Sequence, residues 1–338
     1  MAVTERVEKI RQNYLNERPH ISCERARIWT ESFKRTEGLP QQIRTAQAFY
    51  DACNELPVNI FEGELIVGAS GEYRRCGILT PEYGWKWVND EMDNFATRPQ
   101  DPYDMTDEQR EFCRKEIFPY WKGKSVEDTF LARVSDETKR IGVDTGFLDT
   151  DSKWRGGIGE ITPDYADQLF PKGFGGIKRE AMERMSQLDE TKAEDMKKMD
   201  FYKSIILVCD GIVRLANRYS EKALEMAAVE KDATRKAELE QIAKNCAAVP
   251  ENPPTSFREA IQFAWFVELG GIIAENPLAL NIGRFDQFMY PYYEADEKAG
   301  KIDYDTALEL VECLWLKYSE WVWVISSNTA GFFAGYTN

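Results

Sequence analysis

The sequence predicts a mainly α-helical protein with a few short strands. Apolar residues recur at three- and four-residue spacing along most of the 338 residues. The 43% hydrophobic content is enough for a large core. Strand-like apolar runs are short, and the clearest of them, Leu65-Ile66-Val67, is interpreted as a buried strand that ends at Gly68.

Helices account for most of the predicted elements. They are expected over residues 4–16, 21–36, 40–56, 84–95, 108–134, 177–189, 195–229 and 231–247, and within 249–276 and 301–326. The second helix is predicted to start at a Ser22 cap. Pro119 is predicted to break the fifth, because proline lacks a backbone amide hydrogen. Ser256 and Glu259 form a capping-box pattern ahead of an almost wholly apolar helix, which must be buried on most sides.

Residues 142–176 interrupt the helical pattern with eight glycines and two prolines. Their aromatic and apolar side chains favour a packed loop over disorder. Within them, RGGIGEITPDY (155–165) raises the question of phosphate binding. It lacks the lysine and Ser/Thr of a P-loop and the third glycine of a dinucleotide-binding motif. The segment is therefore either a plain turn or the wall of a pocket that holds a charged group.

Composition excludes several classes of function. Lys and Arg total 43 against 58 Asp and Glu, a formal net charge of −15, so binding to nucleic acid or to an anionic membrane surface is not expected. No apolar run reaches the ~18–20 residues that cross a bilayer. The N-terminus is charged and helical, unlike a signal peptide, which predicts a cytoplasmic protein.

Cysteine and histidine usage limits the chemistry further. The seven cysteines are scattered without a C-x-x-C pair, which argues against a zinc site or a disulfide scaffold. The single histidine, His20, lies on a proline-flanked turn, so catalysis through a Ser-His-Asp triad or a Cys-His pair is not expected. A metal site built from several histidines is excluded, and no metal ligand is assigned.

Six blocks of sequence then follow one another in a fixed order. They are GELIVGA (63–69), TRPQDPY (97–103), residues 116–128, VPENPPTSFREAIQ (249–262), NIGRFDQFMYPYYEAD (281–296) and FFAGYTN (332–338). Together they resemble the glycyl radical enzymes, the superfamily of pyruvate formate-lyase. They are most similar to the branch of choline trimethylamine-lyase, isethionate sulfite-lyase and the glycerol, diol and hydroxyproline dehydratases. The resemblance covers nearly the whole chain.

The resemblance implies a fold and a chemistry. The fold is a ten-stranded α/β barrel wrapped by helices, of which residues 1–338 form the N-terminal portion of a single domain. The chemistry is hydrogen-atom abstraction by a thiyl radical, which is formed by way of a glycyl radical. An activase that uses S-adenosylmethionine and an iron–sulfur cluster installs the glycyl radical, so this chain is expected to bind no cofactor directly.

Neither radical residue is recognisable in residues 1–338. Family members carry the cysteine in Gly-Cys-x-Glu and the glycine in Arg-Val-x-Gly-Tyr, whereas Cys76 is followed rather than preceded by glycine. The chain is therefore expected to need a C-terminal remainder and to be inactive alone. The other expected partners are the radical-activating enzyme, a small-molecule substrate and, by analogy, a second copy in a homodimer.

The resemblance also implies substrate-binding residues. Glu160 aligns where the choline enzyme has an aspartate that faces trimethylammonium, and Trp154 would offer an aromatic face to such a cation. Arg155 supports the opposite interpretation, a guanidinium fork that binds a sulfonate, with Glu160 paired to it structurally. Leu278 is expected in the pocket wall. Phe333 either lines the cavity or belongs to the core.

These inferences predict an enzyme of anaerobic metabolism, a lyase that eliminates an amine, sulfite or water from a small 1,2-substituted alcohol. It would break a C–N, C–S or C–O bond. Glu160 favours a choline-like substrate and Arg155 an isethionate-like one. Two alternatives stay open. One is a diol or glycerol dehydratase of the same family, and the other is a non-catalytic helical scaffold or degenerate paralogue that keeps the six blocks as fold determinants.

Overall fold

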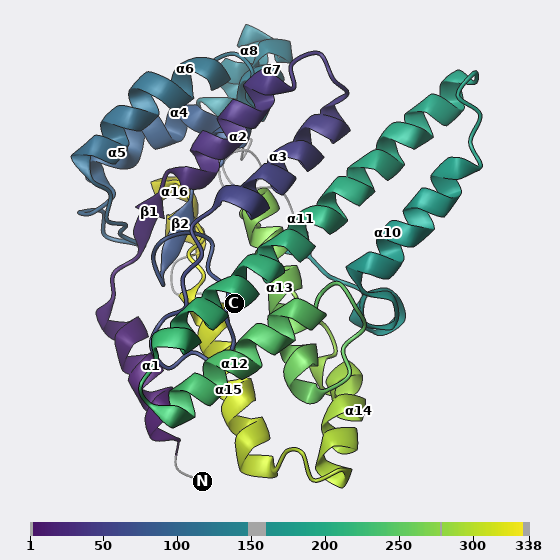
Figure 1. Ribbon diagram of the computed structural model, residues 1–338. Coiled ribbons are helices and arrows are strands. Elements are labelled where there is room, and N and C mark those ends of the chain that lie inside the picture. Colours follow the sequence, from purple (N-terminus) through teal and green to yellow (C-terminus); the bar gives the residue numbers. More distant parts are fainter. Residues whose placement is uncertain (1–2, 148–159, 278, 334–338) are drawn as a thin grey trace.

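Figure 1 shows the computed structural model of the chain, which describes residues 3–147, 160–277 and 279–333. Within these ranges the protein is mainly α-helical and has short strands, as the sequence predicts. Helices α10 and α11 run antiparallel and form a long hairpin that extends to the upper right in the figure.

The helices and strands have the following bounds. The α-helices are α1 (Glu5–Asn16), α2 (Glu24–Arg35), α3 (Gln41–Glu55), α4 (Pro81–Glu91), α5 (Asp107–Phe112), α6 (Phe118–Trp121), α7 (Val126–Arg133), α8 (Asp136–Thr138), α10 (Phe170–Ser186), α11 (Ala193–Val229), α12 (Ala233–Ala248), α13 (Phe257–Glu275), α14 (Phe285–Lys298), α15 (Tyr304–Glu320) and α16 (Ser327–Phe333). The strands are β1 (His20–Ser22), β2 (Cys76–Ile78), β3 (Glu160–Ile161) and β4 (Ala279–Leu280). A 3₁₀ turn, η1 (Met92–Asn94), and the π-helical turns η2 (Cys113–Ile117), η3 (Lys139–Val143) and η4 (Tyr165–Leu169) complete them.

A small parallel sheet joins distant parts of the N-terminal half. β1 pairs with β2, and both strands are largely buried. Isolated bridges extend this sheet on both sides, from His20 to Asp104 and from Gly77 to Val322. Parallel strands require crossover connections, which helices supply here. A buried parallel sheet with helical crossovers fits the start of a helix-wrapped barrel.

Helix α13 lies at the centre of the core. The predicted burial is confirmed, because Phe263, Ala264 and Phe266 are fully buried. Helices α3, α11, α12, α14 and α15 all contact it. Ser256 caps the helix through its hydroxyl, which accepts from the amide of Glu259 at 3.2 Å. A helix that is apolar on most sides requires such enclosure, because each Å² of apolar surface left in water costs about 25 cal/mol.

The predicted strand at residues 65–67 is wrong, although the segment is buried as expected. The amide of Val67 donates to Oε1 of Gln262 at 3.0 Å, and Nε2 of Gln262 donates back to the Val67 carbonyl at 2.9 Å. The amide of Ala69 donates to the Tyr219 hydroxyl at 2.8 Å. Side chains of α13 and α11 thus satisfy the buried backbone groups that a strand would satisfy by pairing.

The predicted break at Pro119 is replaced by a π-helical turn. Turn η2 separates α5 from α6, and the amide of Phe118 donates to the Cys113 carbonyl across it. Helical structure is continuous from Asp107 to Trp121, and Pro119 lies just after the π-helical turn that widens the helix ahead of it. The predicted Ser22 cap is also displaced, because α2 begins after Cys23 and the Ser22 hydroxyl accepts from the Glu24 amide at 3.3 Å.

The predicted irregular region ends earlier than expected, because η4 and α10 lie inside it. Gly173 interrupts α10 with a φ of +61° and brings it against the connector that precedes α13. The amide of Phe174 donates to the Pro250 carbonyl at 2.9 Å, and that of Gly175 donates to the Glu251 carbonyl at 2.8 Å. A Cβ atom on Gly173 would lie 2.3 Å from the Glu251 oxygen. Glycine therefore allows the two backbones to touch.

The variant Gly173→Ala should lower the free energy of unfolding by about 3 kcal/mol or more, because the atoms it meets are backbone atoms that cannot rotate away. The matched control is Gly123→Ala, since Gly123 also has a positive φ, +78°, but nothing within 4 Å of its added Cβ. The control should lose only about 1 kcal/mol. Urea denaturation measures both, and equal losses would contradict the close-contact explanation.

Candidate active site

Strands β3 and β4 bring two candidate segments together. Glu160 lies opposite Ala279, and Ile161 lies opposite Leu280, in a parallel pair. Leu278 directly precedes β4 in the sequence. Both segments were predicted to form part of the pocket wall. They are far apart along the chain but are neighbours in the fold.

The end of α13 is held in place just before β4. Arg25 is fully buried, and its Nε and Nη2 donate to the carbonyls of Ile273 at 2.6 Å and Ala274 at 2.7 Å. A cation at a helix C-terminus satisfies carbonyls that lack helical partners and complements the helix dipole. The same guanidinium pairs with Glu82 at 2.7 Å. Asn276 then adopts a left-handed conformation, φ +47°, and turns the chain toward β4.

The segment that leads into α16 is held by three largely buried donors. They are the Tyr103 hydroxyl, Nδ2 of Asn276 and Nη1 of Arg98, at 2.7, 3.1 and 2.8 Å from the consecutive carbonyl oxygens of residues 323–325. Tyr103 and Arg98 belong to the TRPQDPY block, and Asn276 follows α13. One network therefore connects the approach to β4 with the approach to α16, the helix that ends at Phe333.

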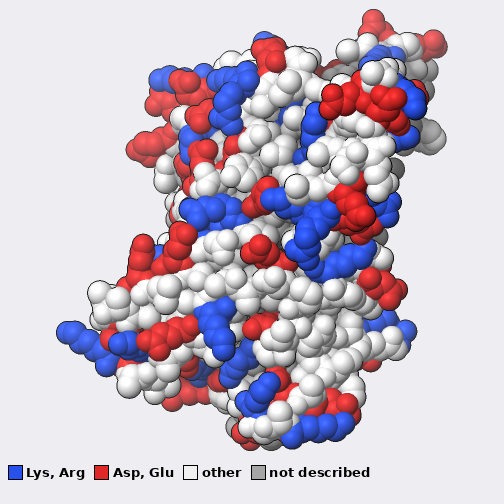
Figure 2. Space-filling view, turned by 45° about the vertical axis from the view of Figure 1, so that its right-hand side comes forward, with Lys and Arg blue, Asp and Glu red and all other residues white. Residues whose placement is uncertain are grey.

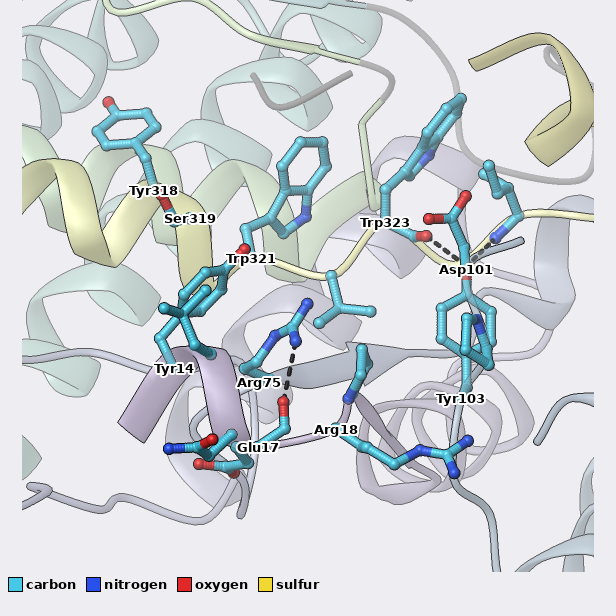
Figure 3. A pocket seen from close by; sticks show the side chains of 16 residues that line it. Tyr14, Glu17, Arg18, Arg75, Asp101, Tyr103, Tyr318, Ser319, Trp321 and Trp323 are labelled. Carbon is cyan, nitrogen blue, oxygen red and sulfur yellow. Dashed lines mark hydrogen bonds between the residues drawn. The ribbon is translucent and has the colours of Figure 1, made fainter. Parts of the chain in front are cut away.

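A cavity of about 470 Å³ opens beside this segment (Figure 3). Its lining comes from the end of α1, from residues 101–103 and from residues 318–325. Arg75 lies 4.6 Å from the ring centroid of Tyr14 and donates to the Glu17 carbonyl at 2.9 Å. The volume is in the range that accommodates small molecules.

A buried carboxyl group connects the segment after β3 with α13. The hydroxyl of Tyr165 donates to Oε1 of Glu268 at 2.8 Å and lies 3.2 Å from the Ala264 carbonyl. Glu268 is fully buried, and burial raises its pKa to about 7, while the hydroxyls of Tyr165 and Tyr318 oppose that rise. Tyr318 also lines the cavity. Glu268 therefore links the segment after β3 to α13.

Four charged side chains form a second buried network beside α15. Lys317 contacts Glu64 and donates to Oε2 of Glu320 at 2.8 Å, and Nη1 of Arg74 donates to Oε1 of Glu320 at 2.9 Å. None of the four side chains is more than 5% exposed. Two cations balance two anions, as burial of charge requires. The Glu64 of the GELIVGA block therefore has a structural role.

The structure describes two of the five predicted substrate-binding residues, and only their backbone. The backbone of Glu160 forms β3, and that of Phe333 ends α16. Trp154, Arg155 and Leu278 lie outside the described residues. The roles assigned to these five side chains stay predictions. Strand β3 follows Trp154 and Arg155 in the sequence, β4 follows Leu278, and these two strands are paired.

The cysteines have the character of structural residues. All seven are buried, and none forms a disulfide. Burial raises the pKa of Cys76 to about 12, so its thiol stays protonated near neutral pH and is a poor nucleophile. Among the described residues, no group of three or more His, Cys, Asp or Glu side chains is arranged to hold a metal ion.

The charged surface is of mixed sign. Figure 2 shows basic and acidic side chains interspersed over one face, without a continuous basic track of the kind that follows a phosphate backbone. On α14, Lys298 and Glu294 form an exposed pair of opposite charge, at 2.9 Å. No helix in the described ranges is both long and apolar enough to cross a membrane.

None of the residues that join these segments was given a site role from the sequence. Tyr165 was expected only as one of the aromatic residues of a packed loop, and Glu268 lies in a helix that was interpreted from its apolar residues. One signal was available: an acidic residue between apolar positions of a buried helix must find a hydrogen-bond donor, and tyrosine is a common one.

Comparisons with known proteins agree on one family. A sequence model described as pyruvate formate lyase-like matches residues 3–338. An isethionate sulfite-lyase from Nitratidesulfovibrio vulgaris is 35% identical over 341 residues, which cover 98% of this chain and 41% of that protein.

Two solved structures show the same fold. The first is a protein structure described for 1,2-propanediol dehydration in Roseburia inulinivorans. It matches this chain with a TM-score of 0.95 and 34% identity, over 99% of this chain and 42% of that one. The glycerol-bound B12-independent glycerol dehydratase from Clostridium butyricum matches with a TM-score of 0.92, also at 34% identity and over 99% and 42% of the two chains. The chain spans about two fifths of the length of these relatives.

Proposed function

Because the chain belongs to the pyruvate formate lyase-like family, we propose that it forms the substrate-binding part of a glycyl radical lyase. The substrate is a small 1,2-substituted alcohol. The observation that carries the proposal is the pairing of β3 with β4, which joins the segment of Glu160 to the segment of Leu278. The buried hydrogen bonds around α13 support it, since a substrate pocket requires a rigid wall.

In the proposed reaction, a thiyl radical takes a hydrogen atom from the carbinol carbon of the substrate. The neighbouring group then leaves as sulfite, water or an amine, and the cysteine returns the hydrogen atom to the product radical. The residues of this chain bind and orient the substrate and exclude water. A C-terminal remainder supplies the radical cysteine, the radical glycine and the catalytic base, and a separate activase installs the glycyl radical.

An isethionate-like anion is the first candidate substrate. The support is the 35% identity with an isethionate sulfite-lyase over 98% of this chain. Arg155 would present two parallel N–H donors to the sulfonate, the geometry in which guanidinium binds oxyanions most strongly. Glu160 would then pair with Arg155 and hold it in position.

Water elimination from a diol is the second candidate. The support is the TM-score of 0.95 with the structure described for 1,2-propanediol dehydration. A neutral diol needs hydrogen-bond acceptors rather than a cation, and Glu160 would accept from its hydroxyl groups. A choline-like cation is the third candidate, because the Glu160 carboxylate would also pair with a trimethylammonium group.

Thermal unfolding of the intact protein should separate these substrates. Isethionate at one hundred times its dissociation constant should stabilise the folded state by about 2.7 kcal/mol. Arg155→Gln should abolish this stabilisation, and Glu160→Gln should weaken it. Choline, glycerol and 1,2-propanediol at the same concentration should have little effect. The measurement is the midpoint temperature with and without each compound.

The matched control is Arg184→Gln, which removes a guanidinium from the exposed face of α10. It should leave the response to isethionate intact. Stabilisation by glycerol or propanediol alone would favour the diol substrate, and stabilisation by choline alone would replace the anion with a cation. If none of the four compounds stabilises the intact protein, and the protein turns none of them over, the proposed function is wrong.

A further inference from the structure

Tyr165 and Glu268 are buried polar residues for which the proposed reaction has no direct use. Tyr165 begins turn η4, a few residues after β3, and is 2% exposed. Its ring stacks on Phe288 of α14 at 4.8 Å and meets Phe170 edge-on at 5.5 Å. Its hydroxyl reaches Glu268 at 2.8 Å. The ring is thus held by apolar contacts. The hydroxyl is directed at α13, where Glu268 is the nearer acceptor and the Ala264 carbonyl, at 3.2 Å, is the other.

Glu268 lies on the helix that leads into β4. Both strands of the β3–β4 pair are therefore connected to the same contact, β3 through Tyr165 and β4 through α13. The pair itself is only two residues long, with Glu160 opposite Ala279 and Ile161 opposite Leu280. So short a pair has too few hydrogen bonds to hold its register alone, and it depends on what holds its flanks.

We propose that Glu268 is a positioning residue for substrate binding, which holds the Glu160 segment against β4 through the hydroxyl of Tyr165. This role rests on the proposed function, because it takes Glu160 to be part of the substrate pocket. Glu268 itself touches no substrate. A carboxyl group suits this task, because a hydrogen bond to it is stronger than one to a neutral acceptor when it is ionised and persists when it is protonated.

Hydrogen exchange of the intact protein tests the contact without any substrate. Tyr165→Phe keeps the ring and removes the hydroxyl. Glu268→Leu removes the nearer acceptor and leaves the hydroxyl only the Ala264 carbonyl, at 3.2 Å. Each should speed exchange at least tenfold in peptides that contain β3 and β4. Glu268→Gln keeps an amide oxygen that accepts from Tyr165, so it should exchange like the unaltered protein.

Tyr219→Phe is the matched control. Tyr219 is as deeply buried, and its hydroxyl accepts from the Ala69 amide at 2.8 Å, on a segment that pairs with neither β3 nor β4. The variant removes one buried hydroxyl in the same way but should leave exchange in β3 and β4 unchanged. Unchanged exchange in Tyr165→Phe, or equal effects of Glu268→Gln and Glu268→Leu, would overturn the proposal.

Steady-state kinetics of the activated enzyme complete the test. Tyr165→Phe and Glu268→Leu should raise KM about tenfold and change kcat less, and Glu268→Gln should restore KM. A role in folding alone would lower the amount of active enzyme and leave KM unaltered, which would overturn the proposal. If exchange responds as expected but the unaltered enzyme turns over no 1,2-substituted alcohol, the contact between Tyr165 and Glu268 stands and the proposed function fails.

Discussion

Replacing Lys317 with methionine should lower the free energy of unfolding by about 3–5 kcal/mol. The substitution leaves Glu64 and Glu320 buried with one cation, Arg74, between them. Burial already raises the pKa of Glu64, and the charge of Lys317 opposes that rise. Without the lysine, one carboxyl group must either stay charged in the core or take up a proton. Urea denaturation followed by tryptophan fluorescence measures the loss.

Lys298→Met is the matched control for that experiment. Lys298 also pairs with a glutamate, at 2.9 Å, but its side chain is 69% exposed. An exposed pair contributes ~0–1 kcal/mol, because water and salt screen it. If the two variants lose similar amounts, the buried network contributes no more than a surface pair does. The double variant Lys317→Met with Glu64→Gln should recover part of the loss, since it removes one unpaired charge.

The stability of the protein should fall by about 3 kcal/mol as the pH rises from 4.5 to above 7, through Glu268 alone. Burial raises the pKa of this group from 4.5 to about 7. Between those values the folded state binds the proton and the unfolded state does not, so the contribution is present at low pH and lost at high pH. The tyrosines beside it, Tyr165 and Tyr318, have raised pKa values and stay neutral throughout.

The measurement for Glu268 is a difference between two proteins. Glu268→Gln cannot titrate, so the stability of the unaltered protein minus that of the variant should decline across this pH range. Glu62→Gln is the control, because Glu62 is exposed and Lys9 lowers its pKa through a hydrogen bond. Its difference should change little, and in the opposite direction. A constant difference for Glu268 would mean that the group has the same pKa folded and unfolded.

Local patterns were sufficient for most of the fold. The helices over residues 40–56 and 195–229 follow from apolar spacing, and the structure places α3 and α11 there. The family also followed from sequence, because six ordered blocks are a long-range signal carried by the sequence itself, and the comparisons confirm the assignment. The errors occur where tertiary contacts replace local ones, as at residues 65–67, where Gln262 and Tyr219 take the place of a strand partner.

The candidate site could be predicted only in part. The sequence directed attention to the segments of Glu160 and Leu278, by resemblance to the family. Their pairing could not be predicted, because a strand pair of two residues leaves no periodicity to recognise. The contact between Tyr165 and Glu268 could not be predicted either, since each residue is ordinary in its own surroundings and the hydrogen bond depends on their distance in space.

The helical class, the burial of α13 and the family could all be predicted from the sequence, because they depend on periodicity and on the order of motifs. Three contacts could be found only in the folded protein: Arg25 caps the end of α13, Lys317 lies between two carboxylates, and β3 pairs with β4. All three have the same cause. A buried polar group must find a partner, and the partner is chosen by geometry rather than by distance along the chain.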